Sequence, residues 1–111
     1  MRTITGQIVF PPNAPKLKAP LITIELHDIS VADAPSKMLT ETRLKNVSVR
    51  PNEHLAFKIK APEASRGVAF RVHVDCDGDG RVSAGDLLTT QVISAPPEGQ
   101  SGPVEVPVTL I

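Results

Sequence analysis

The sequence predicts an all-β protein, folded as a single antiparallel, Ig-like β-sandwich of about seven short strands. Three observations lead to this fold class. Apolar and polar residues alternate in several short segments, as they do in half-buried strands. Eleven prolines interrupt the chain, and long segments with the 3.6-residue apolar period of a helix are lacking. The length of 111 residues suits one domain, residues 1–111, with one modest core.

The clearest strand is the segment 68–74. Val68, Phe70, Val72 and Val74 point to one side of it, and the residues between them point to the other. Other segments with strand character are 4–10, 21–27, 38–49, 55–59, 87–93 and 104–110.

Two of these strands contain irregularities that the sequence itself signals. In 38–49 the alternation breaks around Lys45 and Asn46, which predicts a bulge or a change of sheet there. In 104–110, Pro107 has no N–H for a ladder hydrogen bond, which predicts an edge strand. Turn-forming residues predict that the connections are 11–20, 28–37, 50–53, 61–67 and 95–103.

The composition argues against several classes of function. A formal charge of zero and a pI near 6.8 give no indication of a basic surface for nucleic acid or an anionic membrane. Aromatic residues make up 3% of the chain, with no Trp or Tyr, so stacking platforms for sugars or single-stranded nucleic acid are not expected. The single cysteine, Cys76, excludes an intrachain disulfide.

The chain as written indicates a cytoplasmic protein. No apolar run is long enough to span a membrane, and residues 1–6 lack the apolar core of a signal peptide. The alternative is a periplasmic or outer-membrane lipoprotein whose signal has been trimmed.

The most informative segment for function is the acidic loop, residues 75–86, which follows the strand 68–74 directly. Its carboxylates, glycine and hydroxyl have the spacing of a twelve-residue calcium loop, with Gly80 at the sharp turn. Arg81 would contribute only its backbone carbonyl. The predicted ligands are Asp75, Asp77, Asp79, Arg81, Ser83 and Asp86.

We expect this loop to bind Ca²⁺ weakly, with a Kd on the order of 10⁻⁴–10⁻³ M, as a structural staple. An EF-hand is excluded because a strand, not a helix, leads into the loop. The alternative is an ion-free connection held by side-chain-to-backbone turns. The segment from Ser83 to Asp86 also resembles a capping box, which predicts one short helical turn.

Cys76 and the three histidines have structural interpretations. By alternation from Val74, Cys76 points toward the core and is predicted to be a small buried hydrophobe. His27, His54 and His73 lie on separate elements, and the alternation places His27 and His73 on outward, solvated faces.

Two further groups of charged residues have both structural and functional interpretations. Asp28 and Asp33 are expected to form turns or caps, or alternatively a second ligand set or a partner-binding edge. Lys58, Lys60 and Arg71 are expected to form a solvated basic face, which an acidic peptide could use.

Several segments resemble the YbaY-like and YscW-like families of small bacterial β-sandwich lipoproteins. The similar segments are 5–10, 22–35, 55–59 and 68–74, and the most specific of them is Asp28-Ile29-Ser30-Val31-Ala32-Asp33-Ala34-Pro35. The YscW-like proteins are pilotins, lipoprotein chaperones of type III secretion secretins. The resemblance therefore implies a β-sandwich fold and a role as an envelope lipoprotein or secretion chaperone.

We interpret the chain as a non-enzymatic binding or assembly module that contacts a protein partner through an exposed strand edge. A nucleophile elbow, a His-x-x-x-His motif and a Cys-x-x-Cys motif are all missing from the sequence. The alternatives are a small-ligand carrier, an enzyme of unknown reaction, or a purely structural β-module.

Overall fold

The fold was analysed in a computed structural model, which describes residues 2–29, 37–61, 67–95 and 103–111. All regular secondary structure in these ranges is extended, and they contain no helix that could cross a membrane. The strands are β1 (Arg2–Val9), β2 (Leu17–Asp28), β3 (Lys37–Val49), β4 (His54–Ala61), β5 (Val68–Asp75), β6 (Leu87–Leu88), β7 (Ile93–Ser94), β8 (Val104–Pro107) and β9 (Thr109–Leu110).

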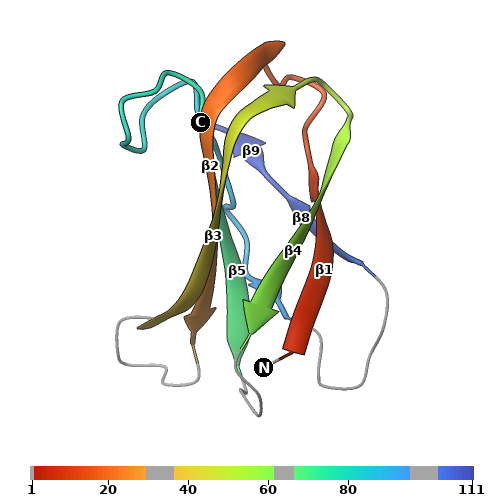
Figure 1. Cartoon of the computed structure of the whole chain (residues 1–111). Helices are drawn as coiled ribbons and strands as arrows, with labels where there is room; N and C mark the ends of the chain where they lie inside the picture. Colours follow the sequence, from red (N-terminus) through yellow and green to blue (C-terminus); the bar gives the residue numbers. More distant parts are fainter. Residues whose placement is uncertain (1, 30–36, 62–66, 96–102) are drawn as a thin grey trace.

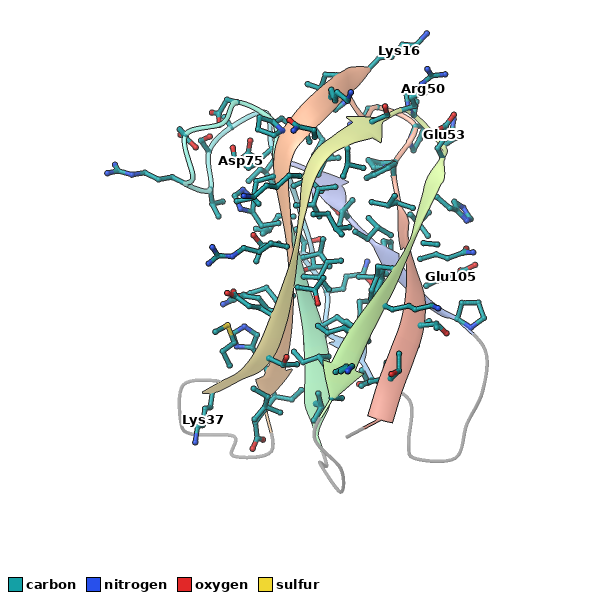
Figure 2. The ribbon with its side chains drawn as sticks, in the orientation of Figure 1. Lys16, Lys37, Arg50, Glu53, Asp75 and Glu105 are labelled. Atoms are coloured by element: carbon teal, nitrogen blue, oxygen red, sulfur yellow. The ribbon has the colours of Figure 1, made fainter. Side chains whose placement is uncertain are left out.

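These strands form two sheets that pack face to face, which confirms the predicted β-sandwich (Figure 1). The first sheet has the order β4-β1-β8, and the second has the order β3-β2-β5-β6-β9, with β7 pairing to β5. Side chains of the two sheets fill the space between the ribbons (Figure 2). The residues that the alternation places inward form one buried core, including Ile4, Ile8, Phe10, Ile22, Ile24, Leu26, Phe57, Ile59, Phe70, Val72, Val74, Leu87, Val106 and Val108.

The expectation that all strands pair antiparallel is wrong for one pair. β8 runs parallel to β1, with Gly6 opposite Val104 and Ile8 opposite Val106. Alternation of apolar residues is the same in parallel and antiparallel strands, so the sequence contains no signal for this direction. β8 is an edge strand, as Pro107 predicts.

The C-terminal segment 104–110 also changes sheet, which the sequence did not indicate. β8 belongs to the first sheet, whereas β9 pairs with β6 in the second. The change occurs at Val108, whose N–H donates to the Val9 carbonyl at 3.2 Å.

The predicted strand 87–93 is interrupted. Leu87 and Leu88 pair with one end of β5, and Ile93 and Ser94 pair with its other end. Between them, the Thr89 side chain takes the place of a backbone partner, since its Oγ1 accepts a hydrogen bond from the Val72 N–H at 3.1 Å. Because a side chain accepts the hydrogen bond that a neighbouring backbone carbonyl would otherwise accept, the chain can depart from the β5 ladder between β6 and β7.

The bulge predicted at Lys45 and Asn46 is misplaced. The register between β2 and β3 is continuous through this region and shifts between Leu26 and His27 instead. Asn46 nonetheless has a left-handed backbone, with φ of 54°. It lies opposite Pro20, which has no N–H to donate, so the ladder is weakened there without a change of register.

Gly6 is required where the ring of its cross-strand neighbour Phe57 lies over β1 in the first sheet. A Cβ at this position would lie 2.7 Å from Phe57 Cε1 and 3.0 Å from the Val104 carbonyl oxygen. The Phe57 ring packs edge-on against Phe70, with centroids 5.8 Å apart, so it cannot move without disturbing the core.

We expect Gly6→Ala to lower the free energy of unfolding by about 1–3 kcal/mol, because the added methyl group overpacks the core. Urea unfolding followed by circular dichroism measures this, since the chain has no Trp or Tyr. Thr5→Val, on the exposed side of the same strand, is the control and should change stability by about 0.5 kcal/mol or less. Equal losses for the two variants would contradict the overpacking argument.

Candidate metal centre

The acidic loop, residues 75–86, connects β5 to β6 and projects from the end of the sandwich where the C-terminus lies (Figure 1). Asp75, the last residue of β5, marks the point where the loop leaves the sheet (Figure 2). Carboxylate oxygens of all four aspartates lie within 4.8 Å of one another: Asp75, Asp77, Asp79 and Asp86. The loop therefore brings together the four carboxylates that the spacing singles out.

Asp75 is 2% exposed, and its carboxylate organises the first half of the loop. Oδ1 accepts a hydrogen bond from the Gly78 N–H at 3.0 Å, and Oδ2 accepts one from the Gly80 N–H at 2.8 Å. Gly80 has φ of 74°, a left-handed conformation that residues with a Cβ rarely adopt. The sharp turn predicted at Gly80 is thus present.

Asp86 is fully buried and closes the loop. Its Oδ1 accepts a hydrogen bond from the Cys76 N–H at 3.0 Å, and its Oδ2 accepts one from the Ser83 N–H at 3.2 Å. The same Oδ2 lies 2.8 Å from Nε2 of His73. A buried carboxylate needs such donors to offset the loss of water, and here donors from the start and the end of the loop provide them.

The helical turn predicted at Ser83 does not form. The Ser83 N–H donates to Asp86 as in a capping box, but the chain enters β6 at Leu87 directly afterwards. The Ser83 hydroxyl does not cap a helix and instead donates to Asp77 Oδ2 at 2.8 Å. Pairing of Leu87 with Val74 on β5 overrides the local helical signal.

Asp77 and Asp79 are exposed and lie in tight side-chain-to-backbone turns. Asp77 Oδ1 accepts a hydrogen bond from the Asp79 N–H at 3.2 Å, and Asp79 Oδ1 accepts one from the Arg81 N–H at 2.8 Å. The hydrogen bond from the Ser83 hydroxyl, followed by the one from the Asp79 N–H, lowers the pKa of Asp77 from 3.8 to about 2. The Asp77 carboxylate is therefore ionised at neutral pH. Both side chains keep lone pairs for a hard cation.

The loop combines the two interpretations that the sequence left open. Its turns are held by side-chain-to-backbone hydrogen bonds, and its carboxylates converge as a cation site requires. Coordination of an ion by the predicted ligands, including the Arg81 carbonyl and the Ser83 hydroxyl, stays a prediction.

Cys76 is half-buried and packs against the core, on the side that the alternation predicts. Its Sγ lies 3.7 Å from the Val74 carbonyl oxygen. Burial, and secondarily the charge of Asp86, raises the pKa of the thiol above its usual value of 9.0. The thiol is therefore protonated at neutral pH, which suits a packing role and not a nucleophile.

The prediction that His27 and His73 are solvated is wrong. The His73 side chain is 17% exposed and the His27 side chain is 12% exposed. His73 contacts Asp86, and Nε2 of His27 lies 3.0 Å from Glu25 Oε1. His54 is exposed and contacts Gln7 at 3.1 Å.

His73 is the residue of this site that sequence reasoning missed. Its position two residues before Asp75, on the same side of β5, was a usable signal. The contact itself depends on the path by which the loop returns Asp86 to the sheet.

The predicted basic face of Lys58, Lys60 and Arg71 does not exist as one surface. Lys58 and Lys60 lie on β4 in the first sheet, whereas Arg71 lies on β5 in the second. Asp28 ends β2, and Asp33 lies outside the described residues, so the structure does not test the second ligand set.

Comparison with known proteins supports the fold. No protein-family model matches this chain, and no curated protein matches its sequence significantly. Among solved structures, an alternative pilotin from the type II secretion system of Vibrio cholerae is similar, with a TM-score of 0.57 and 20% sequence identity. The match covers 97% of this chain and 96% of the pilotin chain, so nearly the whole β-sandwich is shared.

We expect Asp86→Ala to lower the free energy of unfolding by about 2–4 kcal/mol in the presence of a chelator, because it leaves buried donors unpaired. Asp79→Ala is the matched control, and since Asp79 is exposed it should cost about 1 kcal/mol or less. Urea unfolding followed by circular dichroism compares them. Similar losses for both variants would show that the Asp86 carboxylate does not organise the loop.

Proposed function

We propose that this protein is a non-enzymatic binding and assembly module that docks a protein partner by strand addition at the free edge of β3. The observation that carries this proposal is the length of that edge. β3 has 13 residues and, within the described part of the chain, pairs only with β2. A partner segment in extended conformation could therefore form a continuous ladder of backbone hydrogen bonds with it.

The other edges of the two sheets are less suitable. β4 has 8 residues, β9 has 2, and β8 has 4 and contains Pro107. β8 therefore lacks one of its backbone donors, and the shortest strand offers very few ladder positions.

The side chains of β3 favour a partner over a second copy of the same edge. Lys37 and Lys45 are exposed and positively charged, and two such edges side by side would repel each other. Arg43 is paired with Glu41 at 3.1 Å. Lys37 lies opposite Asp28 in the ladder, whereas Lys45 lies opposite Leu21 and has no acidic residue across from it. A neutral or acidic partner strand fits this edge best.

The fold and the resemblance together support a pilotin-like role. The described fold is similar to that of a pilotin, and the segments of the chain that resemble YbaY-like and YscW-like proteins point to the same class. We infer that the partner is a secretin subunit and that the chain acts in the bacterial envelope. A cytoplasmic location would require a different partner.

We also propose that the acidic loop binds Ca²⁺ as a structural staple, through Asp75, Asp77, Asp79, the Arg81 carbonyl, Ser83 and Asp86. Four carboxylates lie together against the single guanidinium of Arg81, a formal charge of −3. A divalent cation would relieve their mutual repulsion. The Asp86 side chain already links the two ends of the loop through its hydrogen bonds with Cys76 and Ser83. The ion would therefore stiffen a loop that is already formed and would not switch the fold.

Calcium titration of the chelator-treated protein, followed by NMR, tests the ion site. We expect saturable shifts of the amides of residues 75–86, with a Kd on the order of 10⁻⁴–10⁻³ M. Asp77→Asn should weaken binding, since it removes a charged ligand while an amide keeps the local turn. An unchanged spectrum at several millimolar calcium would disprove the ion site.

Proline substitution tests the β3 edge, using Glu41→Pro and Thr42→Pro. Successive N–H groups of a strand point to opposite sides, so only one of these substitutions removes a hydrogen bond to β2. The other proline variant should remain folded, which circular dichroism verifies, but its free edge lacks a hydrogen-bond donor for the partner strand. We expect this folded variant to lose co-purification with co-expressed secretin subunits from the same genome.

Alanine at the same position is the matched control, because it keeps the N–H and should preserve co-purification. Undiminished co-purification of the folded proline variant would rule out strand addition at β3. Absence of co-purification with the unmodified chain would count against a secretin as the partner.

A further inference from the structure

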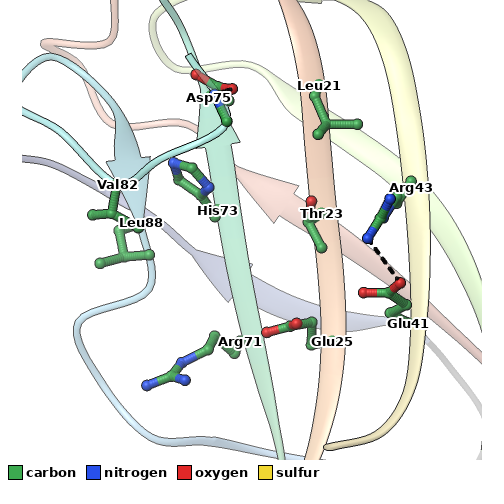
Figure 3. Close-up of a pocket in the computed structure, with 11 residues that line it drawn as sticks. Leu21, Thr23, Glu25, Glu41, Arg43, Arg71, His73, Asp75, Val82 and Leu88 are labelled. Carbon is green, nitrogen blue, oxygen red and sulfur yellow. Dashed lines mark hydrogen bonds and ion pairs between the residues drawn. The ribbon is translucent and has the colours of Figure 1, made fainter. Parts of the chain in front are cut away.

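Arg71 has an unusual environment for an exposed arginine on the face of a sheet. It lies on the outer face of β5, and its guanidinium group has no hydrogen bond or ion pair with any described residue. Its cross-strand neighbour Glu25 is bonded to His27, and Figure 3 shows the Arg71 side chain extending away from Glu25. The guanidinium group is therefore available to an external acceptor.

Two adjacent hollows on this face share Arg71 as a lining residue. The larger has a volume of about 600 Å³ and includes Val82 and Leu88 (Figure 3). The smaller has a volume of about 250 Å³ and includes Ile29 and Val92. The larger volume lies within the usual range of ligand sites, about 300–1,000 Å³.

Exposed apolar side chains gather around the same arginine. Five large hydrophobic residues are exposed in the described part of the chain, and three of them line these hollows. Val92 is 72% exposed, Val82 is 56% exposed and Ile29 is 38% exposed. Each hollow contains at least one of them. Exposed apolar groups around an arginine are typical of surfaces that become buried in a protein complex.

The other charged groups on this face are already engaged. Arg43 forms an ion pair with Glu41, and Glu25 is hydrogen-bonded to His27. The buried carboxylate of Asp75 accepts hydrogen bonds from two backbone N–H groups. Arg71 is thus the charged side chain that borders both hollows and has no hydrogen-bond partner among the described residues. An acidic side chain of a partner would complement it, whereas a basic one would be repelled.

We propose that the surface formed by Ile29, Arg71, Val82, Leu88, Thr89 and Val92, the Arg71 surface, binds a partner-protein segment in which an aspartate or glutamate lies between apolar residues. The acidic side chain of the partner accepts two parallel hydrogen bonds from the N–H groups of the Arg71 guanidinium. The apolar residues on either side occupy the hollows at Val82 and at Val92. This surface lies on the face of the sheet and not on the β3 edge, so it does not depend on strand addition.

Selection of random peptides displayed on phage, against the immobilised full-length chain, tests this proposal. The expected peptides carry Asp or Glu flanked by Leu, Ile, Val or Phe. In solution, Arg71→Glu should weaken their binding by about tenfold to a hundredfold, since a charge-assisted hydrogen bond is lost and a repulsion is added. Arg50→Glu changes an exposed cation in the turn between β3 and β4 and is the matched control.

Val92→Ser tests the apolar part separately and should weaken binding several-fold, because it removes exposed apolar surface that the peptide covers. Both Arg71 and Val92 are exposed, so the variants should fold, which circular dichroism verifies. NMR shifts caused by the selected peptides should map to Arg71, Val82, Leu88 and Val92.

Three results would overturn the proposal. These are a selection without enrichment, enriched peptides that bind Arg71→Glu as well as the unmodified chain, and peptide-induced shifts confined to β3. The last of these would support strand addition at the β3 edge while rejecting the Arg71 surface, so the two proposals are separable.

Discussion

Asp86, whose carboxylate is buried, connects parts of the chain that would otherwise be separate. Its side chain accepts hydrogen bonds from Cys76 and Ser83 and contacts His73 on β5. Its backbone carbonyl accepts a hydrogen bond from the N–H of Ile111 at 3.0 Å, which fixes the C-terminus beside the loop. A buried carboxyl group is tolerated only with such partners, so its side chain holds the loop against the end of β5. The backbone hydrogen bond adds the C-terminus to this arrangement.

This arrangement determines what the acidic loop can do. Because hydrogen bonds within the protein already shape the loop, a cation would enter a largely preformed site. The ion would contribute by neutralising carboxylates that lie within 4.8 Å of one another. A stiffening role follows from this geometry more readily than a sensor role, which needs a large change of shape on binding.

The two proposed contact surfaces both belong to the second sheet. β3 forms its free edge, and Arg71 lies two strands away on its outer face. β2 pairs with both β3 and β5 over long stretches and therefore holds the two surfaces in a constant relation. A sheet that offers one long edge and one outer face suits the assembly role proposed above.

Much of this architecture is encoded locally and could be predicted from the sequence. Alternation in 68–74 identifies β5 and its buried face, because side chains on a strand point to opposite sides in turn. The spacing of Asp75, Asp77, Asp79 and Asp86 predicts their convergence, because it is set by one short loop. By contrast, the parallel pairing of β8 with β1, the contact of His73 with Asp86 and the isolation of Arg71 depend on residues distant in sequence. Periodicity specifies which side of a strand is buried but not which strand lies beside it or what covers its outer face, and only the tertiary structure decides those.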